Sequence, residues 1–113
     1  MSRLLDDETL QSLPALYTSE EVEDPMVHLK LFTPWTNWTW YVIEFDGDDV
    51  FFGLVDGHEL ELGYFTLSEL ESIRGPGGLR IERDEHFEAK PLSAVREGAE
   101  RTRRGFGPRG RSR

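Results

Sequence analysis

FTPWTNWTWYVIEFD, residues 32–46, is the stretch that decides the fold. It holds all three tryptophans of the 113-residue chain and its longest run of β-forming residues. We predict a central strand over residues 38–45, since β-branched and aromatic side chains favour strands. Alternation would place Tyr41, Ile43 and Phe45 on a core face with Thr39, and Trp38, Trp40, Val42 and Glu44 on the other.

Neighbouring segments predict strands that pair with this central one. Residues 26–32, 50–55 and 59–65 each alternate apolar and polar side chains or are rich in β-formers. The acidic residues 46–49 make one turn, and Asp56-Gly57 is typical of a two-residue type I′ hairpin turn. In the last of these strands, alternation predicts that Leu60, Leu62 and Tyr64 point inward.

Helices are predicted by their end signals. Thr66 and Glu69 form a capping box that begins a helix over residues 67–74, and Gly75 and Pro76 end it. Weaker signals predict helices at residues 6–13 and 92–101. Between them, residues 79–87 should be extended, anchored by Ile81 and Phe87.

These elements predict an α+β fold. We expect a small twisted antiparallel sheet, a meander of about four to five strands, with short helices packed mainly on one face. Residues 1–95 would form a single acidic domain, and residues 96–113 the end of a basic helix and a disordered, Arg- and Gly-rich tail.

The charge is unevenly distributed. The chain has a net charge of −9, but residues 96–113 carry seven Arg and two Glu, which leaves −14 on residues 1–95. A body this acidic repels nucleic-acid phosphate. The chain has no cysteine, which excludes disulfides and thiolate sites. With no apolar run long enough for a membrane helix and no signal peptide, we expect a cytoplasmic protein.

Several runs of residues then match a known family in order. They are residues 14–17 (PALY), 30–34 (KLFTP), 37–41 (NWTWY), 51–53 (FFG), 61–65 (ELGYF), 67–76 (LSELESIRGP) and 81–84 (IERD), followed by Phe87. Over residues 4–95 the chain resembles the family called domain of unknown function 2958. Its members are small bacterial and archaeal proteins, often encoded on plasmids, phages and integrated elements. The resemblance implies a mobile-element context and transfers no catalytic or binding residues.

The sequence contains no recognisable catalytic or metal-binding motif. Asp46-Gly47-Asp48-Asp49 looks like the start of a calcium loop, but the EF-hand spacing puts Phe51 and Gly57 where Gly and Glu are needed. No nucleophile elbow or phosphate-binding loop is present. We therefore predict no catalytic residues, no metal site and no cofactor.

Candidate binding residues lie in two places. Aromatic side chains beside charges favour a binding surface, and Glu82, Asp84 and His86 would fall together on one extended segment. Trp38 and Trp40 are either part of this surface or part of the core, depending on whether a helix covers their face. The candidates are Trp35, Asn37, Trp38, Trp40, Tyr64, Glu82, Asp84 and His86.

Three functional hypotheses follow. The first is a non-enzymatic interaction protein that binds a basic protein partner through its acidic surface, as a mobile-element accessory or anti-defence factor. The second is a small-ligand or enzymatic domain with a pocket near Trp35, Trp38 and Tyr64. The third and weaker one is non-specific nucleic-acid binding by the tail, through Arg101, Arg103, Arg104, Arg109, Arg111 and Arg113.

Overall fold

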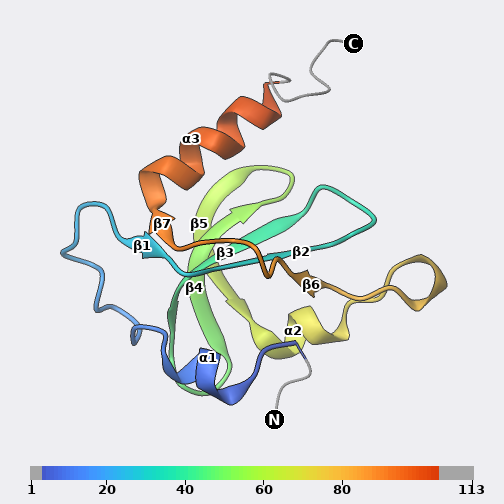
Figure 1. Cartoon of the computed structure of the whole chain (residues 1–113), viewed down its shortest axis with the longest axis horizontal. Helices are drawn as coiled ribbons and strands as arrows, with labels where there is room; N and C mark the ends of the chain where they lie inside the picture. Colours follow the sequence, from blue (N-terminus) through green and yellow to red (C-terminus); the bar gives the residue numbers. More distant parts are fainter. Residues whose placement is uncertain (1–3, 105–113) are drawn as a thin grey trace.

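The structure, a computed structural model, describes residues 4–104 and confirms the α+β class (Figure 1). Its helices are α1 (Asp7–Gln11), α2 (Leu67–Ser72), the 3₁₀-helix η1 (Pro76–Gly78) and α3 (Leu92–Arg103). Its strands are β1 (Met26–Val27), β2 (Leu29–Phe32), β3 (Thr39–Phe45), β4 (Val50–Asp56), β5 (Leu60–Thr66), β6 (Glu82–Arg83) and β7 (Lys90–Pro91).

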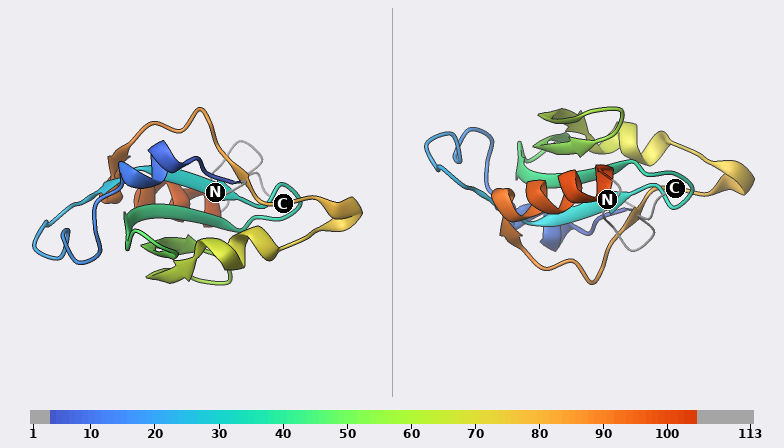
Figure 2. Two further views of the ribbon diagram at one scale, coloured as in Figure 1. Left: turned by 90° about the horizontal axis from the view of Figure 1, so that it is seen from below. Right: turned by 90° about the horizontal axis from the view of Figure 1, so that it is seen from above.

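The main sheet has the order β5-β4-β3-β2-β6, with antiparallel neighbours throughout. Strands β2 to β5 form the predicted meander, and β6 returns to pair with β2. β1 and β7 make a second, two-stranded sheet. The loop that follows α1 and the turn around η1 project from opposite ends of the molecule (Figure 2).

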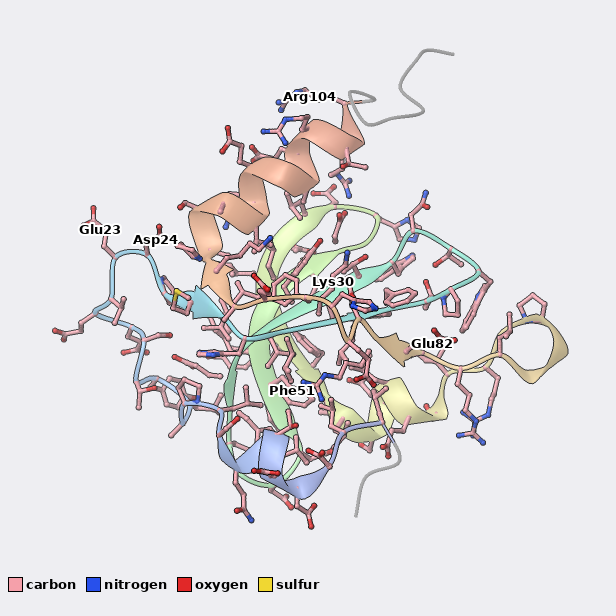
Figure 3. All side chains as sticks on the ribbon, viewed as in Figure 1. Glu23, Asp24, Lys30, Phe51, Glu82 and Arg104 are labelled. Atoms are coloured by element: carbon pink, nitrogen blue, oxygen red, sulfur yellow. The ribbon has the colours of Figure 1, made fainter. Side chains whose placement is uncertain are left out.

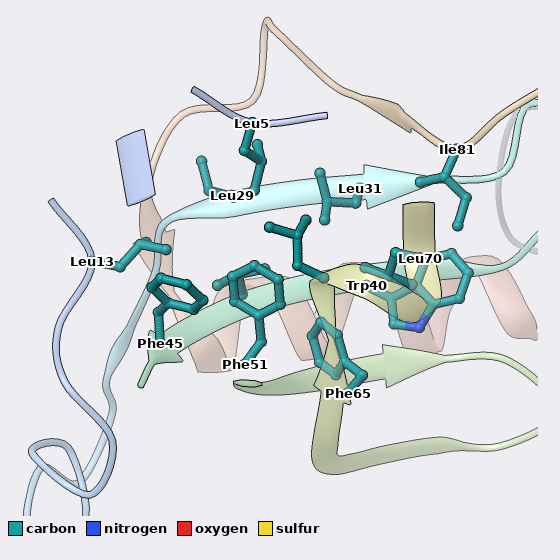
Figure 4. Close-up of a cluster of buried hydrophobic side chains, with 12 residues drawn as sticks. Leu5, Leu13, Leu29, Leu31, Trp40, Phe45, Phe51, Phe65, Leu70 and Ile81 are labelled. Carbon is teal, nitrogen blue, oxygen red and sulfur yellow. The ribbon is translucent and has the colours of Figure 1, made fainter. Parts of the chain in front are cut away.

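Hydrophobic clusters cover both faces of the main sheet. The larger cluster joins β2, β3, β4 and β5 to α2 and to residues flanking α1 (Figure 4). Its members are Leu5, Leu13, Leu29, Leu31, Trp40, Val42, Phe45, Phe51, Phe65, Leu67, Leu70 and Ile81. The smaller cluster, Val27, Ile43, Leu54 and Val95, joins the other face to α3. α1 and α2 thus share one face, whereas α3 packs on the other.

A β-bulge in β3 corrects the predicted division of faces. Val42 pairs with Gly53 but Glu44 pairs with Phe52, so Ile43 is an extra residue in the ladder. One extra residue exchanges the faces of everything beyond it. Phe45 therefore joins Trp40 in the larger cluster instead of sharing a face with Ile43.

The inward face predicted for β5 is also wrong. Leu62 is 42% exposed and Tyr64 is 57% exposed, and Leu60 is only half-buried. Phe65 is the buried residue of this strand, because its side chain points to the larger cluster on the opposite face. β5 is at the edge of the sheet and extends beyond the cover that α3 provides.

Gly57 and Gly75 do not adopt the turn and helix-end conformations that the sequence predicts. Gly57 lacks the positive φ that a type I′ turn requires, and Gly75 has φ −109°, not the left-handed cap conformation. A Cβ on Gly57 would lie 2.4 Å from the Trp38 ring, and one on Gly75 would lie 2.4 Å from the Trp35 ring. Each glycine is the surface on which a tryptophan rests.

The helix starts follow the sequence more closely than the helix ends. The capping box of Thr66 and Glu69 is formed, but α2 stops at Ser72 because Ile73 is extended. α3 runs to Arg103, and Val95 and Ala99 are buried as the predicted stripe requires. The extended segment is a strand only at β6, with Ile81 and Phe87 packed in different clusters.

Glu44 is a buried carboxylate, 3% exposed, that anchors the loop after α1. Its oxygens accept hydrogen bonds from the backbone N–H of Tyr17 and of Ser19, both at 2.8 Å, and from the Ser19 hydroxyl. Tyr17 has φ 71°, an uncommon conformation for a residue with a side chain. The loop after α1 is therefore fixed at one end to the central strand.

Gly53 and Gly63 are cross-strand partners that provide a matched test of packing. A Cβ on Gly53 would lie 1.9 Å from the Tyr41 carbonyl oxygen, whereas one on Gly63 meets nothing within 4 Å. We expect Gly53→Ala to lower the free energy of unfolding by about 3 kcal/mol or more. Gly63→Ala should leave it unchanged or raise it by about 0.5 kcal/mol. Urea denaturation measures both, and equal values would contradict the close approach.

Candidate functional site

A groove of about 950 Å³ lies between α3, the β2–β3 strands and residues 84–90. Lys30, Trp38 and Tyr41 line it from the strands. Asp84, His86, Phe87 and Lys90 line it from the segment that leads to β7, and Ala94, Gly98 and Thr102 from α3. Trp38, Tyr41 and Phe87 give it aromatic walls.

Tyr41 and Phe87 form the apolar base of the groove. Their ring centroids are 6.2 Å apart, and the Lys90 ammonium lies 5.3 Å from the Phe87 ring centroid. Burial, followed by the negative charges of Asp56 and Asp84, raises the pKa of Tyr41 to about 12. The Tyr41 hydroxyl therefore stays protonated at neutral pH and is available as a hydrogen-bond donor or acceptor.

Two charged pairs line the groove. In one, the Lys30 ammonium is 3.6 Å from an Asp84 carboxylate oxygen. In the other, the Arg103 guanidinium pairs with Asp56 and donates hydrogen bonds to the carbonyl oxygens of Gly57 and His58, at 3.0 and 2.7 Å. These pairs fix the polar rim around the aromatic base.

The α3 wall of the groove consists of small residues. Ala94, Gly98 and Thr102 are four residues apart, so they form one stripe along the helix. A Cβ added to Gly98 would meet nothing within 4 Å. The size of the side chain at position 98 therefore determines how much space remains beside α3.

The structure brings together four of the eight candidate binding residues. Asn37, Trp38, Asp84 and His86 all line the groove. Trp38 also packs against the imidazole ring of His58, with ring centroids 5.3 Å apart.

The other four candidates lie elsewhere. Trp40 is 6% exposed in the larger cluster, beside Leu70 and Ile81, which makes it a core residue (Figure 4). Trp35 rests on Gly75, and Glu82 is exposed on β6 (Figure 3). Tyr64 lies on β5, with its ring centroid 5.2 Å from that of Phe52. Of the three residues expected to form a pocket together, Trp38 lines the groove, and Trp35 and Tyr64 do not belong to its lining.

Sequence reasoning missed Lys30, Tyr41 and Phe87 as residues of the groove, and it assigned Arg103 to nucleic-acid binding instead. Tyr41 and Phe87 had been assigned to a core face and to an anchor, since apolar alternation does not distinguish a core from a groove base. Arg103 could have been found from its helical spacing, four residues after Ala99 on the stripe that packs on the sheet.

The arginines assigned to nucleic-acid binding differ in their surroundings. Arg103 donates a hydrogen bond to the Gly57 carbonyl oxygen at the β4–β5 turn, and the Arg101 guanidinium is 3.5 Å from a Glu97 carboxylate oxygen. Arg104 is exposed at the end of α3 (Figure 3). Arg109, Arg111 and Arg113 lie outside the described residues, so nucleic-acid binding by this segment stays a prediction.

Within residues 4–104, no group of three or more His, Asp or Glu side chains is arranged to hold a metal ion. The Asp46 carboxylate organises its own turn, since one oxygen accepts from the backbone N–H of Asp48, Asp49 and Val50 at 2.8, 2.8 and 3.0 Å. The same part of the chain has no helix both long and apolar enough to cross a bilayer.

Comparison with known proteins places the chain in a family. The model of the family described as protein of unknown function (DUF2958) matches residues 4–104. The chain belongs to this family. The match includes the groove, the residues that line it and the whole of α3. No curated protein and no solved structure matches the chain.

The environment of the groove base can be tested through the ionisation of Tyr41. Because its pKa is raised from 10.0 to about 12 on folding, the folded state holds this proton more tightly than the unfolded state. The stability that Tyr41 contributes should be complete below pH 10.0 and should decline as the pH rises toward about 12. When tyrosine ionisation is followed by near-ultraviolet absorbance, Tyr41→Phe should remove the phenolate transition that occurs at the highest pH. A transition unchanged in this variant would contradict the assignment.

Proposed function

We propose that the protein is a non-enzymatic interaction protein that docks on a basic protein partner through its acidic surface. The observation that carries the proposal is the charge of the described chain. Residues 4–104 hold 22 Asp and Glu against nine Lys and Arg, a net charge of −13. Three of those nine cations, Lys30, Arg101 and Arg103, already pair with carboxylates of the same chain. A surface of this kind attracts a positively charged partner and speeds its association.

One region concentrates this charge, and we name it the acidic hollow. It lies between α1, the β3–β4 turn and α2, and Asp7, Asp48, Asp49 and Glu71 line it without any Lys or Arg. Asp49 accepts hydrogen bonds from the backbone N–H and hydroxyl of Ser68, and Glu71 accepts one from the backbone N–H of Leu4. These two carboxylates are held in place, so a partner would find them ordered.

The biological setting is part of the same proposal. The resemblance to plasmid- and phage-borne proteins supports a role as a mobile-element accessory or anti-defence factor acting in the cytoplasm. An acidic protein can occupy the basic surface by which a nucleic-acid-binding protein grips phosphate, since both present negative charge to it.

Affinity capture from a host-cell lysate tests this function. At low ionic strength the wild-type chain should retain proteins with basic surfaces, and salt should release them. Asp7→Asn combined with Asp48→Asn should lower retention about fivefold, because both exposed carboxylates border the acidic hollow.

The matched control is Glu82→Gln combined with Glu88→Gln. Both residues are exposed, and the change in net charge is the same. Retention in this control should stay close to that of the wild type. Failure to recover any basic protein at low salt, or equal losses in the two double variants, would count against docking at the hollow.

A second function is favoured by one observation, the groove with its aromatic base. In this proposal the groove binds a small molecule whose apolar part packs on Trp38, Tyr41 and Phe87. Gly98→Leu would occupy the space beside α3, whereas Gly98→Ala would leave most of it open.

A thermal-shift screen against a metabolite library tests the groove. Compounds that raise the Tm of the wild type and of Gly98→Ala should have no effect on Gly98→Leu. Without ligand, Gly98→Ala should be more stable by about 1 kcal/mol, since alanine favours a helix over glycine. The absence of any stabilising compound, or equal shifts in all three proteins, would argue against a ligand in the groove.

A further inference from the structure

β5 has one side without a strand partner. It lies at the end of the order β5-β4-β3-β2-β6 and pairs with β4 over all seven residues, Leu60–Thr66, without a bulge. β6, at the other edge, has only two residues. Within residues 4–104 no strand pairs with the outer side of β5.

The register shows which backbone groups of β5 point outward. The Leu67 N–H donates to the Asp49 carbonyl oxygen at 2.8 Å, and the Gly57 N–H donates to the Glu59 carbonyl oxygen at 3.1 Å. In an antiparallel ladder the hydrogen-bonded pairs alternate, so the odd-numbered residues of β5 bond to β4. The N–H and C=O groups of Leu60, Leu62 and Tyr64 therefore face away from the sheet.

The same three residues form an apolar strip on one face of the strand. Leu62 and Tyr64 are 42% and 57% exposed, and the Tyr64 ring packs beside that of Phe52. The opposite face carries Glu59 and Glu61, both exposed. An added strand would meet apolar side chains on one face and carboxylates on the other.

β5 lacks three of the devices that usually protect an edge. It has no Lys, no Pro and no bulge, and residues 59–73 contain four Glu and no Lys or Arg. Desolvation, then the neighbouring Tyr17, and then the charges of Glu44 and Glu20 raise the pKa of Tyr64. The surroundings of this edge are complementary to a basic chain.

We propose that β5 receives an extended segment of a partner protein, in which basic and apolar residues alternate, as an additional antiparallel strand. This inference rests on the proposed function, because it gives the same basic partner a second contact, at the β5 edge, and a defined conformation there. Main-chain hydrogen bonds to Leu60, Leu62 and Tyr64 provide affinity, and the alternation provides specificity. A second copy of this chain fits less well, since pairing two β5 strands would bring Glu59 and Glu61 of two acidic bodies together.

The probe is a fluorescent peptide of about eight residues that alternates Val and Lys, measured by anisotropy. Its Val residues would lie opposite Leu62 and Tyr64, so their N–H groups would bond to β5, and the Lys N–H groups would point away. N-methylation of the Val residues should weaken binding at least about tenfold, and N-methylation of the Lys residues less than about threefold. A peptide with the same residues in two blocks should bind about tenfold more weakly than the alternating one.

Protein variants test the same edge from the other side. Leu62→Pro removes an N–H that takes no part in the sheet, so the fold should persist while binding of the alternating peptide is lost. Leu62→Thr keeps that N–H and should bind within about threefold of the wild type. If Leu62→Pro fails to fold, amide exchange in the wild type decides, because the peptide should protect the amides of Leu62 and Tyr64.

The outcomes separate this inference from the function on which it rests. Equal binding of the alternating and block peptides, sensitive to salt and to Asp7→Asn with Asp48→Asn, would overturn the edge and keep the acidic-surface function. No binding of either peptide at low salt would overturn both. If the wild type sediments as a dimer and Leu62→Pro abolishes the dimer, then β5 pairs with a second copy of this chain. This result would overturn the proposal of a basic partner segment.

Discussion

The extra residue in β3 is the constraint on which the rest of the structure depends. With Ile43 inserted in the ladder, Trp40, Val42 and Phe45 share one face, and Glu44 is brought to the opposite face. A carboxylate that is 3% exposed needs hydrogen-bond donors, since an unsatisfied buried charge is severely destabilising. The backbone of Tyr17 and Ser19 provides these donors. The bulge therefore determines the course of a loop more than twenty residues away in sequence.

The three tryptophans have three different environments, although they lie within six residues of each other. Trp40 is core because α2 and Ile81 cover it. Trp35 and Trp38 lie in and after the β2–β3 turn, and each rests on a glycine of a distant segment. Trp38, whose ring packs on Gly57, also lines the groove together with Tyr41. Gly57 and Gly75 thus leave the space that a tryptophan ring occupies.

The groove and the outer edge of β5 differ in charge and in the backbone groups that they expose. The groove contains pairs of opposite charges around an aromatic base, which suits a compact ligand. The outer edge of β5 combines backbone groups that point away from the sheet, an apolar strip and carboxylates without cations, which suits an extended basic chain. α3 separates the two, because it covers Ile43 and Leu54 and leaves the β5 side of that face exposed.

Much of the candidate site could not be predicted from the sequence, for identifiable reasons. Asn37, Trp38, Asp84 and His86 line the groove and, while their binding role stays a prediction, they were named as candidates. Tyr41 and Phe87 were not, because apolar patterns record that a residue is covered, not what covers it. The inward side of β5 was mistaken because alternation gives two faces and does not say which of them a helix packs on.

Sequence by itself determined the local elements of this protein: the strands of the meander, the capping box that begins α2 and the buried stripe of α3. Each depends on interactions between residues a few positions apart. Only the tertiary structure decided the bulge at Ile43, the glycine seats of Trp35 and Trp38 and the open edge of β5. These depend on contacts between segments that are distant in sequence, and such contacts leave no periodic signal along the chain.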